Sequence, residues 1–331
     1  MTASPSLDVV GIGNALVDVL SHEDHSFVEE HGLVRGAMTL VDTERAEHLY
    51  AVMGPAMEMS GGSAGNTIAG VASFGGRAGY LGRVFDDQLG AVFAHDLRAQ
   101  GVRFDIKPAA DGPPTGRCLI VVTPDAQRTM STCLGASALF GPGDVDPAMV
   151  EDAAVTFLEG YLFDRPESKA AYWAASERAA GAGRQVALTL SDLFCVERHR
   201  DDFLPLVRDR VDILFANEAE ACALWDCDEV GVAVERARSE VAVACITRSE
   251  EGSIVVAGAA THEIGAEPVD VVDTTGAGDL YAAGFLFGYT QGRPLPECGR
   301  LGAIAAAEVI SHMGARPEVR LADLDPGAGD G

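Results

Sequence analysis

The chain has 331 residues, 47% of them apolar, and carries 50 acidic against 24 basic side chains, a formal net charge of −26. This length and apolar content allow a large buried core, and the excess of negative charge disfavours nucleic acid and anionic membrane as partners. The N-terminus shows no basic segment followed by an apolar one, and no apolar run approaches membrane-spanning length, so we expect neither a secretory signal nor a transmembrane helix. Seven scattered cysteines without a CxxC pair predict reduced thiols and a cytoplasmic location.

The first half of the chain alternates short apolar runs with helical patterns. It predicts a helix at residues 44–53, a small-residue helix after the glycines at 61–62, a helix at 88–98, and strands at residues 8–14, 38–42, 78–84, 117–123 and 128–133. Residues 124–127 are typical of a hairpin turn between the last two strands. Gly11 and Gly13 do not make a dinucleotide-binding site, because Leu16 stands where a third glycine is needed and no fitting acidic residue follows about twenty positions later.

The second half continues this alternation. It predicts helices at residues 168–180 and 303–310, a strand pair at 243–248 and 253–256, and strands at 155–160, 185–190 and 211–216. Strands that alternate with helices at this spacing indicate a parallel sheet wound in βαβ units, and hence the α/β class. The Gly-, Asp- and Pro-rich tail after residue 320 is expected to fray.

The most informative stretch is Asp-Thr-Thr-Gly-Ala-Gly-Asp at residues 273–279. Val271 and Val272 before it predict the end of a strand, and the alanine-rich segment after it predicts a helix. Glycines let the backbone approach a ligand, and the free N–H groups and dipole of the helix favour an anion there. Asp279 in the first helical turn then suits phosphoryl transfer to an alcohol, in which a carboxylate takes the proton and amides stabilise the transferring group. A capped helix after a glycine turn is the plain alternative.

Residues 273–279 resemble the C-terminal signature of the ribokinase-like (PfkB) carbohydrate kinase family. Gly-Gly-Ser-Ala-Gly-Asn-Thr at residues 61–67 resembles the sugar-binding stretch of that family. The resemblance extends from residue 9 to about residue 317, and Gly-Asn-Ala-Leu-Val-Asp at 13–18 is most similar to the adenosine kinase branch. It implies one ribokinase-like domain over residues 1–331, a parallel-sheet α/β/α sandwich with a small β-sheet lid built from segments near 15–60 and 115–135.

The resemblance also assigns the acceptor site. The residues that it implies for acceptor binding are Asn14, Leu16, Asp18, Gly62, Ser63 and Asn66. A carboxylate suits this role because its two oxygens can accept hydrogen bonds from two neighbouring hydroxyls, although Asp18 on its own is equally typical of a turn. One of Tyr161, Leu162 and Phe163, together with Leu16, either lines a pocket for the base of the acceptor or belongs to the core.

For the reaction itself, the resemblance makes Asp279 the catalytic base. It implies that charge on the phosphoryl group is stabilised by Arg128 and by the amides of Gly276, Ala277 and Gly278. The implied nucleotide-binding residues are Asn217, Thr247, Gly252 and Thr275, with Glu220 ordering magnesium through water. Ser249 departs from the family pattern, which usually has a glycine at this position of the nucleotide turn.

The expected cofactors are ATP and magnesium. Residues 312–315, with Asp273 and Thr275, resemble a loop that can hold a monovalent cation such as potassium. The reaction so predicted is phosphorylation of the 5′-hydroxyl of a ribonucleoside, with adenosine favoured, by a protein that could form a homodimer. The alternatives are another nucleoside or a free sugar such as ribose or fructose as the acceptor, or a regulator that binds nucleosides or nucleotides without turnover.

Overall fold

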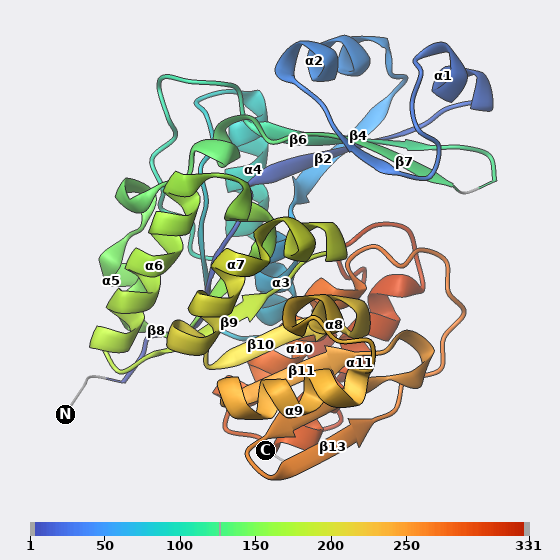
Figure 1. Cartoon of the computed structure of the whole chain (residues 1–331). Coiled ribbons are helices and arrows are strands. Elements are labelled where there is room, and N and C mark those ends of the chain that lie inside the picture. The colour runs from blue at the N-terminus through green and yellow to red at the C-terminus, as the bar shows by residue number, and fades with distance from the viewer. Residues whose placement is uncertain (1–3, 126, 328–331) are drawn as a thin grey trace.

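The computed structural model describes residues 4–125 and 127–327 and contains two separate β-sheets (Figure 1). The larger has eight strands in the order β13-β12-β11-β10-β9-β8-β1-β5. Its strands are β1 (Leu7–Ile12), β5 (Ala78–Leu81), β8 (Ala153–Glu159), β9 (Gln185–Thr189), β10 (Ile213–Asn217), β11 (Val243–Thr247), β12 (Ser253–Ala257) and β13 (Ala260–Ile264). All neighbours pair in parallel except β11–β12 and β12–β13, so the predicted α/β class with a parallel sheet is confirmed.

The smaller sheet has five strands in the order β3-β7-β6-β2-β4. They are β2 (Leu16–His22), β3 (Met38–Leu40), β4 (Ala56–Gly61), β6 (Gly116–Val122) and β7 (Arg128–Cys133). In Figure 1 this sheet overhangs the larger body, and α1 (His25–Glu30) and α2 (Thr43–Val52) lie on its far side. The other face carries an apolar patch of Cys118, Ile120 and Val122, against which Met313 from the body packs. The two parts of the molecule therefore meet along this face.

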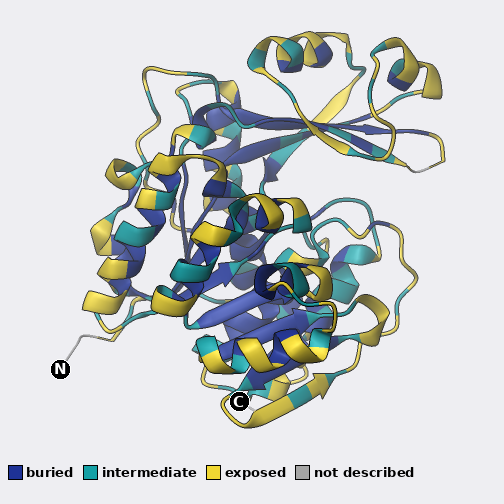
Figure 2. Ribbon diagram, in the orientation of Figure 1, coloured by how far each residue is buried: buried dark blue, intermediate teal, exposed yellow. Residues whose placement is uncertain are grey.

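Helices cover both faces of the larger sheet. One core contains α3 (Ser63–Ser73), α4 (Gln88–Ala99), α10 (Ala277–Thr290) and α11 (Leu295–Ile310). The opposite core contains α5 (Pro147–Asp152), α6 (Pro166–Gly181), α7 (Leu193–Arg210), α8 (Glu218–Trp225) and α9 (Val230–Glu240). Adjacent strand residues divide between the two cores, as Val9 and Val10 do, which is why the inner strands are unbroken apolar runs and appear dark in Figure 2.

Two sequence predictions are wrong here. Val271 and Val272 do not end a strand: they are 59% and 51% exposed, and the N–H of Val272 donates to the carbonyl of Ile310 at the end of α11 instead of to a strand edge. The segment after residue 320 does not fray as far as Gly327, because Leu321 is fully buried and Arg293 makes two hydrogen bonds to Asp325. The helix expected at 303–310 is present but begins earlier, at Leu295.

Other predicted elements match the structure closely. The strands at 117–123 and 128–133 pair antiparallel as β6 and β7, although Ala126 of the predicted hairpin turn lies outside the described residues.

All seven cysteines are free; five are buried, and Cys222 and Cys227 are partly exposed. Within the described part of the chain, no helix is both long enough and apolar enough to cross a membrane.

The turn from β4 into α3 depends on Gly62. Its φ is +84°, in the left-handed region, and an added Cβ would lie 2.2 Å from the carbonyl oxygen of Asn14. A side chain is therefore excluded by strain and by a backbone contact together. Glycine here lets the start of α3 approach the connection from β1 to β2 at Asn14.

We predict that Gly62→Ala destabilises the fold more than Gly75→Ala does. Gly75 has a similarly positive φ of +95°, but nothing lies within 4 Å of an added Cβ, so it reports backbone strain alone. The clash at Gly62 should add roughly 2 kcal/mol or more to that strain in the free energy of unfolding. Urea unfolding of the two variants measures the difference, and equal losses would show that the Asn14 contact is easily relieved.

Candidate active site

Two helix N-termini meet at Asp279. This residue is the third of α10, and its Oδ1 accepts a hydrogen bond from Ser63 Oγ at 2.6 Å. Its Oδ2 accepts from Asn66 Nδ2 at 2.9 Å. Ser63 and Asn66 both lie in the first turn of α3, so the motif at 273–279 and the glycine stretch at 61–67, more than 200 residues apart, are joined at one carboxylate. The structure thus brings together three residues that the sequence predicted for one site.

The electrostatics of Asp279 balance opposing effects. Burial raises its pKa above the ordinary value, while the hydrogen bonds from Ser63 and Asn66 and the positive charge of Arg316 lower it. Asp18, on β2 of the small sheet, lies near enough for the two carboxylates to repel each other. Burial raises the pKa of Asp18 to about 6, against the attraction of Arg316 and Arg128. Two nearby carboxylates with raised pKa values form a site that can accept a proton or hydrogen bonds from hydroxyl groups.

Glu159 is a buried carboxylate that bonds to two segments of the site. It is 1% exposed at the end of β8, and its Oε1 accepts from Asn14 Nδ2 at 2.7 Å and from the Asn14 amide at 3.2 Å. Its Oε2 accepts from the amide of Ala64 at 2.8 Å, one of the unpaired N–H groups at the start of α3. Burial raises the pKa of Glu159 to about 7 in spite of these three bonds. The carboxylate of Glu159 therefore fixes the positions of β1 and α3 relative to each other.

Asn14, predicted to bind the acceptor, is itself held on two sides. Its amide group donates to Glu159, and its Oδ1 accepts from Ser137 Oγ at 2.9 Å. Asn14 is 2% exposed, although it lines the cavity described below.

The turn before α10 has the geometry of an anion site. Gly276 adopts φ +82°, and an added Cβ would lie 2.9 Å from Ala315, whereas Gly278 faces open space. The amide of Ala277 donates to Thr274 O at 3.3 Å and is thus used within the turn. The next amides, at Gly278 and Asp279, begin a helix and have no helical carbonyl to bond. We expect these amides, more than that of Ala277, to meet a ligand.

Arg128 connects the small sheet to this turn. Its Nη1 forms an ion pair with Asp273 Oδ2, and both side chains are nearly buried, at 9% and 7% exposed. Asp273 also accepts from the amide of Gly314 at 3.0 Å and from the hydroxyl of Thr275 at 2.7 Å. The family resemblance implies that Arg128 reaches the transferring phosphate. In this structure it reaches the turn before α10 but is paired with Asp273.

Two of the predicted nucleotide-binding residues lie at the carboxyl ends of neighbouring strands. Asn217 and Thr247 are register partners in β10 and β11, and Thr247 pairs across the hairpin with Ser253, the residue after Gly252. Ser249 adopts φ +51°, a left-handed conformation that explains why glycine is usual at this position. Ser249 accepts this strain without disrupting the turn, since the N–H of Gly252 still donates to its carbonyl at 3.1 Å.

Glu220 and Asn217 form reciprocal hydrogen bonds at the start of α8. Glu220 Oε1 accepts from Asn217 Nδ2 at 2.6 Å, while Asn217 Oδ1 accepts from the Glu220 amide at 2.8 Å. Burial raises the pKa of Glu220 to about 7. Among the described residues, no group of three or more His, Cys, Asp or Glu side chains is arranged to hold a metal. A single buried carboxylate fits magnesium that is held mainly by phosphate oxygens and water.

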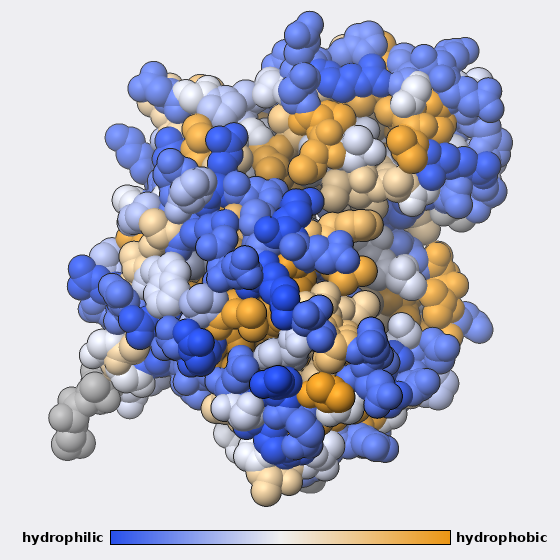
Figure 3. Space-filling view, viewed as in Figure 1, coloured by the Kyte–Doolittle hydropathy of each residue, from blue (hydrophilic) through white to orange (hydrophobic). Residues whose placement is uncertain are grey.

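A cavity of about 420 Å³ lies between the small sheet and the body, on the Asn14 side of the site. Tyr161 and Leu162 line it from the body, and Leu40 lines it from the small sheet. Phe163 does not, because it is 1% exposed and stacks on Phe203, so its predicted alternative as core is confirmed. Leu16 is also buried and lies outside this lining. Figure 3 shows apolar side chains gathered where the small sheet overhangs the body.

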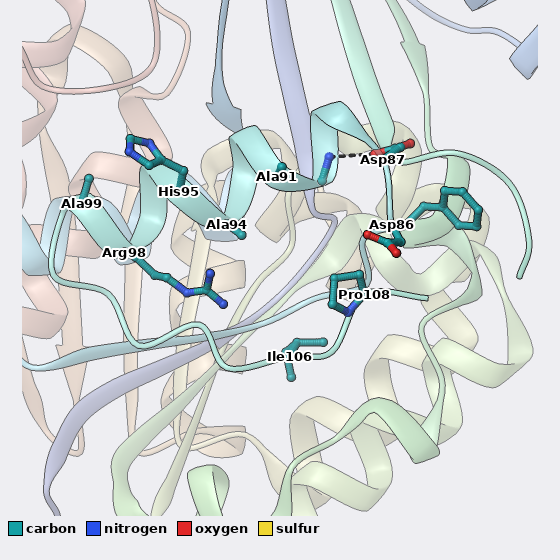
Figure 4. A pocket seen from close by; sticks show the side chains of 11 residues that line it. Asp86, Asp87, Ala91, Ala94, His95, Arg98, Ala99, Ile106 and Pro108 are labelled. Carbon is teal, nitrogen blue, oxygen red and sulfur yellow. Dashed lines mark hydrogen bonds between the residues drawn. The ribbon is translucent and has the colours of Figure 1, made fainter. Parts of the chain in front are cut away.

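A second hollow, of about 560 Å³, lies beside α4 and away from these residues (Figure 4). Its lining comes from α4 and from the segments at residues 85–87 and 106–108. Arg98 on this helix is used in donating to the carbonyl of Phe104, and Asp87 in accepting from the amide of Gly90. None of the predicted site residues lies in this hollow.

Sequence reasoning missed two residues of the site. Glu159 stood at the end of a predicted strand, and an acidic residue at the carboxyl end of a parallel strand is a signal that could have identified it. Arg316 lies beyond every motif, and nothing in the local pattern distinguishes it from a surface arginine.

The geometry defines a class of protein. A carboxylate at a helix N-terminus, with unpaired amides beside it and a second carboxylate close by, is suited to transferring an anionic phosphoryl group to a hydroxyl.

Comparison with known proteins agrees with this class. Residues 50–320 match the model of the pfkB family of carbohydrate kinases. The crystal structure of adenosine kinase from Sinorhizobium meliloti is 54% identical, with a TM-score of 0.88 over 96% of this chain and 98% of that one. A probable sugar kinase from Rhizobium etli is 48% identical, with a TM-score of 0.89 over 97% and 98%. Adenosine kinase of Saccharomyces cerevisiae is 26% identical over 92% of this chain and 95% of its own length.

The chain belongs to the pfkB family of carbohydrate kinases and is a kinase of the nucleoside or sugar type. Its resemblance to the adenosine kinase branch, inferred from residues 13–18, is confirmed by these relatives.

We predict that Glu159→Gln reduces the pH dependence of stability. The pKa of Glu159 in the folded chain, about 7, lies above its ordinary value of 4.5, so the folded state binds this proton more tightly than the unfolded chain does. The stability of the wild type should therefore fall as pH rises from about 4.5 through 7, and removing this carboxyl should make the fall between pH 5 and 8 smaller by about 1–3 kcal/mol.

Denaturant unfolding of the wild type and variant at several pH values measures this difference. Asp18 and Glu220 are present in both proteins, so their effects cancel. Glu47→Gln, at an exposed position, is the control and should follow the wild type. Parallel curves for Glu159→Gln and the wild type would show that Glu159 does not take up a proton on folding in this range.

Proposed function

We propose that the protein transfers the γ-phosphoryl group of ATP to the 5′-hydroxyl of a ribonucleoside, with adenosine as the preferred acceptor. The observation that carries the proposal is Asp279, held by Ser63 and Asn66 at the N-terminus of α10 and close to Asp18. The high identity to an adenosine kinase over nearly the whole chain supports the choice of acceptor.

In this proposal the acceptor lies between the two carboxylates. Asp18 accepts hydrogen bonds from the ribose hydroxyls, and Asn66 offers its Oδ1, which is buried and has no partner in the described structure. Gly62 and Ser63 bring the start of α3 against the sugar. Asp279 takes the proton of the 5′-hydroxyl as its oxygen attacks the γ-phosphorus, a role that its raised pKa favours.

The N-terminus of α10 stabilises the phosphoryl oxygens. The amides of Gly278 and Asp279 face the anion site, and Gly276 lets the turn pack on Ala315. Arg128 is close enough to exchange its bond to Asp273 for one to a phosphate oxygen. The small sheet that carries Arg128 and Asp18 acts as a lid, which excludes water that would otherwise hydrolyse ATP.

The nucleotide lies across the ends of β10 and β11. Asn217, Thr247, Gly252 and Thr275 contact it in this proposal, with Ser249 forming the turn beside Gly252. Kinases of this family generally use ATP and magnesium. When bound, magnesium neutralises phosphate charge, and Glu220 holds it through water, since both its oxygens accept from Asn217.

We assign no step to a monovalent cation. The carboxylate of Asp273, expected to help hold one, already bonds Thr275 and Gly314 and pairs with Arg128. A guanidinium supplies the positive charge at this position.

The cavity beside Asn14 favours a nucleoside over a free sugar. Leu40, Leu134, Tyr161 and Leu162 give it apolar walls, and a volume of about 420 Å³ exceeds what a bare pentose needs. A flat base placed there would bury apolar surface and contribute on the order of one to three kcal/mol. Ribose and fructose have nothing to fill this space.

We predict that kcat/KM for adenosine exceeds that for ribose by roughly ten- to a hundredfold. Leu40→Ala should lower the adenosine-to-ribose ratio by about tenfold, because ribose makes no contact with that wall. Leu40 is 51% exposed, so its removal should leave the fold intact. Asp18→Ala should impair both acceptors, since each presents hydroxyls to that carboxylate.

The matched control is Met38→Ala, on the same strand, 45% exposed and outside the cavity lining. It should leave the ratio unchanged. Initial rates of ADP release with adenosine, ribose and fructose provide the measurement. A free sugar that equals or exceeds adenosine, with Leu40→Ala neutral, would establish the sugar-kinase alternative, and no turnover with any acceptor would favour a binding protein.

A further inference from the structure

Arg316 enters the body of the protein from the segment after α11 and ends beside the active site. Its Nε donates to Ser60 O at 3.1 Å, and its Nη2 donates to Ser60 Oγ at 3.1 Å. Its Nη1 donates to Gly65 O at 2.9 Å and to Gln100 Oε1 at 3.3 Å. One guanidinium thus joins three segments that are distant in the sequence: β4, α3 and the end of α4.

Two of these partners adjoin the carboxylates of the site. Ser60 precedes Gly61, where an added Cβ would lie 2.5 Å from the carboxylate of Asp18. Gly65 lies between Ser63 and Asn66, the two residues that hold Asp279. The forked set of four hydrogen bonds from the Arg316 guanidinium therefore fixes two parts of the site. One is the backbone against which Asp18 packs, and the other is the helical turn that orients Asp279.

The charge of Arg316 acts on the same two groups. It makes no ion pair within the described part of the chain, because its hydrogen bonds go to neutral acceptors. Its positive charge is therefore not neutralised by direct contact, and it lowers the pKa of both Asp18 and Asp279. Burial lowers the pKa of Arg316 itself only to about 10, so it stays protonated at neutral pH.

The other charged groups around the site do not replace it. Asp18 on β2 and Glu159 on β8 are acidic, and each repels the carboxylate of Asp279. Asp96 on α4 acts on Arg316 and is also acidic, while burial raises the pKa of Tyr80 on β5 and keeps its phenol neutral. Tyr161 lies near Asp279 as a neutral phenol, because burial raises its pKa far above the ordinary value. Arg128 from β7 acts on Asp18 but is paired with Asp273.

We propose that Arg316 is a positioning residue for phosphoryl transfer: it locks β4 to α3 and supplies the unpaired positive charge that faces Asp18 and Asp279. The proposal rests on the function proposed above only in the roles of those two carboxylates. It predicts two separable effects, one from the fork of hydrogen bonds and one from the charge.

The direct test is titration of the carboxyl groups by NMR in protein labelled with ¹³C at aspartate carboxyl carbons, with Asp18→Asn and Asp279→Asn to assign the two signals. In Arg316→Gln both midpoints should rise by about one pH unit relative to the wild type. Arg178→Gln makes the same change in net charge at an exposed ion pair with Glu151 and should leave them unchanged. Midpoints that do not move in Arg316→Gln would overturn the proposal.

Arg316→Lys separates the two effects and serves if the glutamine variant does not fold. Lysine keeps the charge but cannot reproduce a planar fork of four bonds. Its carboxyl midpoints should stay within a few tenths of a pH unit of the wild type, while KM for the acceptor rises several-fold and kcat changes less. Unchanged kinetics in this variant, or midpoints that rise as in Arg316→Gln, would contradict the proposal.

The pH profile of kcat/KM gives a second readout. Its acid limb should move to higher pH in Arg316→Gln but not in Arg316→Lys, whereas a purely structural role would lower the whole profile evenly. A wild type that phosphorylates none of adenosine, ribose and fructose would overturn the proposed function and leave the titration test of Arg316 intact, because that test uses no substrate.

Discussion

The active site depends on keeping the carboxylate of Asp279 charged in a partly buried place that also contains Asp18 and Glu159. Burial favours protonation of all three, Asp18 and Glu159 each repel Asp279, and the net charge of −26 does nothing to relieve this. The interactions that keep Asp279 charged are local: two hydrogen bonds from α3, the positive end of α10 and the guanidinium of Arg316. A base poised in this way accepts a proton more readily than an exposed aspartate would.

The fold provides these interactions by bringing distant segments to one point. The starts of α3 and α10 come together because both helices pack on the same face of the larger sheet. The small sheet brings Asp18 and Arg128 to that point, where Arg128 pairs with Asp273 before α10 and Arg316 bonds to Ser60 at the end of β4. Gly62 allows the start of α3 to approach the connection from β1 to β2, since any side chain there would meet the backbone of Asn14.

Much of this architecture could be predicted from the sequence. Apolar runs of strand length identified the strands of the parallel sheet, because strands buried on both faces leave an unmistakable pattern. Asp279 followed from the glycine turn before a predicted helix, and the resemblance of the two glycine motifs to the family signatures implied Ser63 and Asn66 as acceptor-binding residues. The left-handed φ of Ser249 also accords with the glycine expected there.

What could not be predicted depends on tertiary contacts. Val271 and Val272 have the composition of a strand but no partner edge, so their backbone bonds to the end of α11. Leu321 and Asp325 lie in a segment with the composition of a loose tail, and only burial and Arg293 fix it. Glu159 and Arg316 act through bonds to backbone atoms of residues far away in the sequence, which leave no local pattern.

The most direct test of the account is single-turnover phosphoryl transfer by Asp279→Asn, with ATP and adenosine binding measured alongside by calorimetry. Asparagine keeps the shape of the site, since its oxygen can still accept from Asn66 and its amide can donate to the hydroxyl of Ser63, but it cannot take a proton. We predict that the transfer rate falls by about a hundredfold or more while both dissociation constants stay within a few-fold of the wild type. A transfer rate within a few-fold of the wild type would contradict the account, because Asp279 would then not be the base.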